Sequence, residues 1–98
     1  MKQIAFHPSA DAEVTEAAQY YEVQKSGLGS QLLVDVERAL HQILKNPEAS
    51  PRIGRRLRRK SLLRFPYNLV YAVHQDKILI LAYAHQKRLP FYWRKRLK

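Results

Sequence analysis

The chain has 98 residues, a formal net charge of +10 and no cysteine. This length suits one domain with a single core, and the lack of cysteine excludes disulfides and thiolate metal sites. The longest apolar stretch, 78–84, is far shorter than the roughly 20 residues of a membrane-spanning helix, so we expect one soluble, cytoplasmic domain over residues 1–98.

The first half of the chain predicts a short strand and two helices. Residues 3–7 place apolar side chains on one face, which is typical of a short strand. Apolar residues at intervals of three and four then predict a helix over 9–24, with Ser9 as its N-cap. After a glycine-containing turn at 25–30 the same spacing returns over 32–44. The two helices are expected to form an antiparallel hairpin.

The second half predicts three strands. Residues 55–63 form a strand rich in cations, residues 67–74 are rich in β-formers, and residues 78–84 are apolar on both faces. A strand that is apolar on both faces belongs in the middle of a sheet, covered on both sides. The element order predicts an α+β fold in which the helical hairpin packs on a twisted antiparallel sheet, with a short helix or arm at 88–98.

The charge is divided unevenly along the chain. Residues 1–49 contain four Lys and Arg against seven Asp and Glu, whereas residues 50–98 contain fourteen Lys and Arg against Asp76 alone. Uncompensated positive charge of this density attracts polyanions, so we expect nucleic acid, a ribosome or an acidic protein as the partner. Solubility alone does not require such segregation.

Four segments together resemble the RelE/ParE superfamily of toxins from bacterial type II toxin-antitoxin systems. They are A-A-Q-Y-Y-E-V-Q-K-S-G-L-G at 17–29, L-L-V-D-V-E-R-A-L at 32–40, R-F-P-Y-N-L-V-Y at 64–71 and A-H-Q-K-R-L-P-F-Y-W-R-K-R at 84–96. The resemblance spans most of the chain and keeps the elements in order. It implies a helical hairpin on a twisted antiparallel sheet, and a cognate antitoxin that neutralises the toxin.

The resemblance implies one of two activities. ParE-type members poison DNA gyrase, and RelE-type members cleave messenger RNA on the ribosome. The hairpin sequence Y-Y-E-V-Q-K-S-G-L-G looks closer to the ParE type, so the first hypothesis is a ParE-like toxin that inhibits growth through gyrase. A RelE-like ribosome-dependent endoribonuclease is the alternative, and a non-toxic binding module with the same fold is the third.

RNA cleavage without a metal requires a general base, a general acid and cations beside the phosphate. An imidazole can give or take a proton near neutral pH, so His85 is the candidate for this role. It would work beside Arg58 or Arg64, with Tyr92 in the tail. A hydrogen-bonded histidine at a strand end explains His85 equally well, so enzymatic activity stays open. The other histidines lack ligand spacing and no glycine-rich phosphate loop occurs, so we expect neither a metal nor a cofactor.

Cations interleaved with aromatic residues in the second half predict a surface that binds the target or the antitoxin. The cations assigned to it are Arg56, Arg58, Lys60, Arg64, Arg88, Arg94 and Arg96. The first four would share a face if their strand continued unbroken. Trp93, in contrast, is expected to close the end of the core. An acidic antitoxin would mask this surface as a helix or an added strand, and its affinity would fall steeply with salt.

Overall fold

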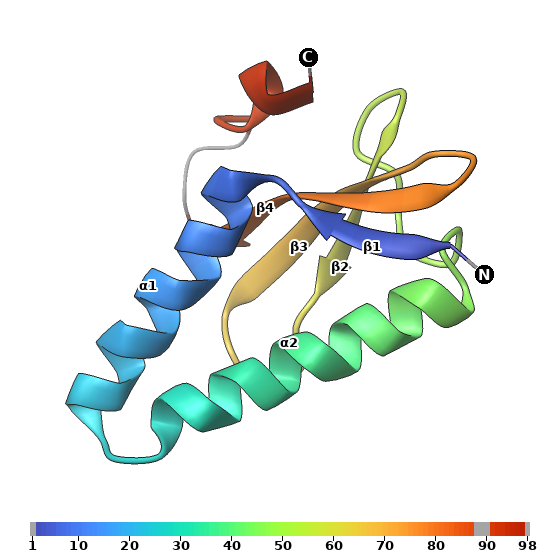
Figure 1. Ribbon diagram of the computed structural model, residues 1–98. Coiled ribbons are helices and arrows are strands. Elements are labelled where there is room, and N and C mark those ends of the chain that lie inside the picture. The colour runs from blue at the N-terminus through green and yellow to red at the C-terminus, as the bar shows by residue number, and fades with distance from the viewer. Residues whose placement is uncertain (1, 88–90, 98) are drawn as a thin grey trace.

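The computed structural model describes residues 2–87 and 91–97. In chain order its elements are β1 (Gln3–Phe6), α1 (Pro8–Gln24), α2 (Leu28–Lys45), β2 (Leu57–Ser61), β3 (Tyr67–Val73), β4 (Lys77–His85) and the short 3-10 helix η1 (Arg94–Leu97). The strands form one sheet, and both helices pack on the same face of it (Figure 1). The predicted α+β fold is confirmed. None of the helices within the described ranges is long and apolar enough to cross a membrane.

The sheet has the strand order β1-β4-β3-β2. β2, β3 and β4 form the predicted antiparallel meander, and β1 adds a parallel strand beside β4, with Phe6 opposite Ile80. The strand predicted to be covered on both faces is therefore internal. Its register shifts once, because Val70 pairs with Ala82 whereas the next residue, Tyr71, pairs with Ile80. Leu81 is the extra residue of this bulge, and it turns the later side chains of β4 to the opposite face.

Helix α1 begins one residue earlier than predicted, because His7 caps it. The Nδ1 atom of His7 accepts a hydrogen bond from the backbone N–H of Ser9 at 3.1 Å. Pro8 occupies the first turn, where its missing N–H leaves no helical bond unmade. The prediction that Ser9 is the N-cap is therefore wrong, although the helix ends at Gln24 as expected.

The connection between α1 and α2 depends on Gly27 in the turn and on Gly29 in the first turn of α2. Gly27 has a φ angle of 89°, in the left-handed region that favours glycine. A Cβ atom on Gly29 would lie 2.5 Å from the carbonyl oxygen of Ala18, so only glycine lets the helices approach this closely. The carboxylate of Glu22 accepts hydrogen bonds from both glycine N–H groups at 2.9 Å. The predicted glycine-containing turn is present but shorter than predicted, because α2 already begins at Leu28.

Two apolar cores lie on opposite faces of the sheet. The larger one packs the helical hairpin against side chains that include Leu69, Tyr71 and Ile80. The smaller one, on the other face, includes Val70 and is closed by Trp93, which is only 6% exposed. The expectation that Trp93 completes the core is confirmed, and the C-terminal segment is thereby held against the sheet.

Strand β2 is shorter than the predicted strand over 55–63. Gly54, with a φ angle of 99°, turns the chain, and the N–H of Ile53 donates to the carbonyl of Leu57 at 2.8 Å. The strand therefore begins at Leu57, and the unbroken strand that a shared cationic face requires is not formed. Of the four cations, Arg58 and Lys60 lie in the strand, whereas Arg56 and Arg64 lie outside it.

Candidate functional site

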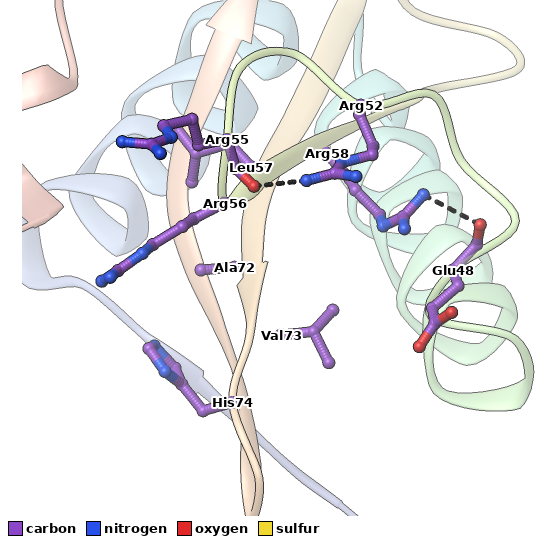
Figure 2. A pocket seen from close by; sticks show the side chains of 9 residues that line it. All are labelled: Glu48, Arg52, Arg55, Arg56, Leu57, Arg58, Ala72, Val73 and His74. Atoms are coloured by element: carbon purple, nitrogen blue, oxygen red, sulfur yellow. Dashed lines mark hydrogen bonds between the residues drawn. The ribbon is translucent and has the colours of Figure 1, made fainter.

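An arginine-rich pocket of about 530 Å³ lies where β2 begins and β3 ends (Figure 2). We call it the arginine pocket. Its charged and titratable lining consists of Arg52, Arg55, Arg56, Arg58, His74 and Glu48. Leu57, Ala72 and Val73 form the apolar part of its wall. The pocket therefore gathers four guanidinium groups around a small apolar floor.

The loop that carries these arginines is fixed to the body of the protein by hydrogen bonds. The buried Tyr71 donates its hydroxyl hydrogen bond to the carbonyl of Pro47 at 2.7 Å. The Nη1 atom of Arg58 donates to the carbonyls of Glu48 and Ser50 at 2.9 and 2.8 Å. Because these bonds reach from the sheet into the loop, the position of the Arg58 guanidinium is set before any ligand arrives.

A second set of bonds closes the loop on the edge of β2. The N–H of Arg59 donates to the carbonyl of Pro51 at 3.0 Å, and Arg52 forms an isolated antiparallel bridge with Arg58. The Nη2 atom of Arg52 also donates to the carbonyl of Arg55 at 2.6 Å, a bond drawn in Figure 2. The loop thus covers the free edge of β2 beside the pocket. Two arginines of the pocket, Arg52 and Arg58, are held in place by these bonds.

The positive charge of the arginine pocket is not neutralised within the described residues. The described residues form two salt bridges, and both lie outside the arginine pocket. They join Arg38 to Asp35 and Arg96 to Glu13, each at 2.9 Å. Glu48 contacts Arg58 through its backbone carbonyl, which accepts a hydrogen bond from the Arg58 guanidinium. In Figure 2 the exposed side chains of Arg55 and Arg56 project on the opposite side of the pocket from Arg58. The arrangement suits an anionic ligand that reaches several guanidinium groups at once.

The other cations assigned to the binding surface lie in different places. Lys60 lines a groove between α2 and β2, beside Asp35. The backbone N–H of Arg64, in the turn after β2, donates to the carboxylate of Asp35 at 3.0 Å, while its side chain is exposed. The guanidinium of Arg94 lies 4.8 Å from the centre of the Phe91 ring. Arg88 lies outside the described residues. Of the assigned cations, the structure brings Arg56 and Arg58 together in one pocket.

Arg96 is engaged inside the molecule. Its Nη1 and Nη2 atoms donate to the carboxylate of Glu13 at 2.9 and 3.1 Å, and Nη1 also donates to the carbonyl of Leu81. The same carboxylate accepts hydrogen bonds from the Tyr92 hydroxyl and from the backbone N–H of Tyr83. The hydrogen bond to Glu13 raises the pKa of Arg96, so the guanidinium stays charged. Arg96 thus anchors the C-terminal segment, and its guanidinium is already engaged within the protein.

The four residues considered for RNA cleavage are not brought together. His85 ends β4, its Nδ1 atom accepts a hydrogen bond from the N–H of Lys87, and it lines a small pocket of about 130 Å³ with Arg59. Arg58 lies in the arginine pocket, and Tyr92 bonds to Glu13. Arg58 and His85 therefore line two different pockets, and the hydroxyl of Tyr92 is held at a third place by Glu13.

The tyrosines beside His85 remain protonated at neutral pH. The ring of Tyr67 stacks on that of Tyr83, with centroids 4.4 Å apart, and meets the His85 ring edge-on at 5.0 Å. Burial, with the neighbouring Tyr21, raises the pKa of Tyr67 to about 12. Burial raises the pKa of Tyr83 further. A phenol in this state does not take up a proton, so neither residue supplies a base for His85.

Four charged or titratable residues of the arginine pocket were missed by sequence reasoning: Glu48, Arg52, Arg55 and His74. They lie in loops or at a strand end, where no periodicity marks them. A signal was nevertheless present, because R-I-G-R-R-L-R at 52–58 places a glycine between cations. A turn at Gly54 folds Arg52 back against Arg58 and concentrates the charge.

Comparisons with known proteins agree with this architecture. The model of the family described as "ParE toxin of type II toxin-antitoxin system, parDE" matches residues 4–90. Among solved structures, a chain of "Chromosomal ParDE TA system from P. aeruginosa" superposes with a TM-score of 0.63 at 19% sequence identity. The match covers 87% of this chain and 96% of that one. At this identity the likeness shows a shared fold. No curated protein matches the sequence.

Proposed function

Since the chain belongs to the ParE toxin family of type II toxin-antitoxin systems, we propose that this toxin inhibits growth by acting on DNA gyrase. The single observation that supports the target most strongly is the arginine pocket, a preorganised cationic site that contains four arginines and only one acidic residue among its described lining. Such a site binds and holds a polyanionic or DNA-bound target without needing to cut it.

The separation of the nuclease candidates also favours gyrase over messenger RNA as the target. General acid-base catalysis requires the proton donor and acceptor within hydrogen-bond reach of one reacting group. His85 lines a different pocket from Arg58, and the hydroxyl of Tyr92 is bound to Glu13. A residue held by an internal carboxylate is poorly placed to protonate a leaving oxygen.

The partner of a ParE toxin is its cognate antitoxin, and we propose that this antitoxin is acidic where it meets the toxin. Fourteen cations against one acid in residues 50–98 leave a surface that an acidic segment would neutralise. A disordered acidic segment that folds on binding would suit it. Binding should weaken steeply as salt is raised, because much of the attraction is between exposed charges.

A supercoiling assay with purified gyrase tests the proposed target. We expect the wild-type protein to inhibit supercoiling and to trap cleaved DNA, and the antitoxin to reverse both effects. A parallel reaction contains ribosomes, messenger RNA and the same toxin. Site-specific cleavage of the messenger RNA, together with unimpaired gyrase, would overturn the proposal in favour of the nuclease.

A further inference from the structure

We propose that the arginine pocket binds the phosphate backbone of duplex DNA. This inference deepens the proposed function, since it makes the DNA held by gyrase, rather than the gyrase polypeptide, the surface that this pocket contacts. The binding itself does not depend on gyrase and is measured without it.

The chemistry of the lining favours phosphate. Four guanidinium groups and His74 surround the pocket, and Glu48 is the only acidic residue among the described ones that line it. An Arg fork donates two parallel hydrogen bonds to one phosphate, which makes Arg the residue suited to planar recognition of phosphodiesters. Because Arg52 and Arg58 are already tied to backbone carbonyls, less side-chain entropy is lost when a phosphate binds.

The surroundings of the pocket disfavour an acidic peptide as its occupant. A peptide gains affinity from apolar anchors or by adding a strand to an open sheet edge. Leu57 and Ala72 are only 6% and 2% exposed, so Val73 is the one apolar side chain of the described lining that is partly exposed, and a peptide would find few apolar anchors. The neighbouring edge of β2 is already paired with the loop through the bonds of Ile53 and Arg59. Phosphate contacts require neither feature.

The same lining distinguishes duplex from single-stranded nucleic acid. Sites for single strands stack unpaired bases on aromatic rings, which contribute much of the affinity. In the described part of the chain no Phe, Tyr or Trp lines the arginine pocket. The aromatic residues of the C-terminal segment, Phe91 and Trp93, line a different pocket on the second face of the sheet. A site with cations and no stacking platform suits a backbone whose bases are already paired.

The test measures binding of the full-length protein to a fluorescently labelled 20-base-pair DNA duplex at several KCl concentrations. The variant carries Arg55→Ala and Arg56→Ala, which remove two exposed guanidinium groups that donate to nothing within the described residues. A matched control carries Lys25→Ala and Lys45→Ala, which remove the same charge from the helical hairpin. Far-UV circular dichroism confirms that both variants fold.

We expect the arginine variant to bind duplex about tenfold more weakly near 0.1 M salt, and the slope of log K against log salt to fall by roughly two. The control should stay within about twofold of wild type. A third variant with Arg55→Lys and Arg56→Lys keeps the charge and loses the fork, so we expect an intermediate affinity.

Three results would overturn the inference. The first is an arginine variant with wild-type affinity and slope. The second is tighter binding to single-stranded DNA than to duplex of equal length. The third is an arginine variant that no longer binds the antitoxin but binds DNA as the wild type does. The proposal that gyrase is the target is tested separately. If wild-type protein binds duplex DNA through these arginines but leaves gyrase activity unimpaired, gyrase is not the target and the DNA-binding site stands.

Discussion

The two halves of the molecule use their charges in opposite ways. In residues 1–49, Glu13, Glu22 and Asp35 each accept hydrogen bonds that join separate elements. In residues 50–98, the arginines of the arginine pocket form no ion pair within the described residues, and Arg55 and Arg56 are exposed. These three acidic residues of the first half therefore brace the fold, and the exposed arginines of the pocket remain available to a partner, whereas Arg96 of the second half is held by Glu13.

This difference shows how a small domain can keep a strongly positive surface. Self-repulsion among cations opposes a compact state. Glu13 ties α1 to the C-terminal segment through Arg96, and Asp35 ties α2 to the turn after β2 through the N–H of Arg64. A few acids placed at element junctions thus hold the cationic half in position without neutralising its pocket. Removing an acid should cost stability, and removing a pocket arginine should cost binding.

The largest effect on stability is expected for Glu13→Ala. The change removes four hydrogen bonds to one part-buried carboxylate, from Tyr83 N–H, Tyr92 and both terminal nitrogens of Arg96. We expect a loss of about 3 kcal/mol in the free energy of unfolding, measured by urea denaturation. Glu16→Ala, at an exposed position of the same helix, should change it by less than about 0.5 kcal/mol. Equal effects of the two changes would refute the bracing role.

A somewhat smaller loss is expected for Asp35→Ala. The carboxylate is only 1% exposed and accepts hydrogen bonds from Arg38 Nη2 and from the backbone N–H of Arg64. The change leaves that N–H unpaired beside a cavity, so we expect a loss of about 2 kcal/mol in urea denaturation. Glu37→Ala, at an exposed position of the same helix, is the control. A loss below 0.5 kcal/mol for Asp35→Ala would contradict the prediction.

The buried tyrosines predict a loss of stability in alkali. Burial raises the folded-state pKa of Tyr67 to about 12 and that of Tyr83 further, above the unfolded value of about 10. Stability from these groups is therefore complete below pH 10 and is lost as the pH rises toward 12, because the unfolded chain releases its protons first. Urea denaturation at pH 8, 10 and 11.5 measures the decline. Unchanged stability across this range would contradict it.

The hydroxyl of Tyr83 gives a prediction of opposite sign. It is buried and has no hydrogen-bond partner among residues 2–87 and 91–97. Removing an unsatisfied buried polar group by Tyr83→Phe should stabilise the protein by about 1 kcal/mol at pH 8. It should also make the alkaline loss smaller, because one of the two raised groups is gone. A variant less stable than wild type at pH 8 would show that the hydroxyl is satisfied.

The smallest effect on stability is expected for the arginine variant, Arg55→Ala with Arg56→Ala. Both side chains are exposed and unpaired within the described residues, so the free energy of unfolding should change by less than about 0.5 kcal/mol. Thermal and urea unfolding measure this. A loss above 1 kcal/mol would place these arginines among the residues that hold the fold and would remove the contrast between the two halves.

The order of elements and the burial of their faces were predictable from the sequence. Helical spacing located both helices, and the two-sided apolar run at 78–84 placed β4 inside the sheet. Such patterns report local structure and burial. The separate expectation that Trp93 closes the end of the core is also met. The bulge at Leu81 was not predictable, because the alternation of apolar residues continues through it.

Most of the site was not predictable, because it depends on contacts between distant residues. The partner of Arg96 is Glu13, 83 positions away, and only the folded chain brings them together. Arg96 was therefore assigned to the binding surface from its neighbours in sequence. The pocket arginines that lie in a loop follow no helical or strand spacing in the sequence. They come together because of the turn at Gly54 and the hydrogen bond from Tyr71 to Pro47.

The role of the cationic half is tested most directly by comparing variants in the gyrase supercoiling assay. With the stability of each variant known, wild-type toxin, the arginine variant and the Lys25→Ala with Lys45→Ala control are titrated against a fixed amount of gyrase and DNA. We expect the arginine variant to need roughly ten times more protein for half-inhibition, and the control to match wild type. Full inhibition by the arginine variant at wild-type concentrations would contradict a function carried by the arginine pocket.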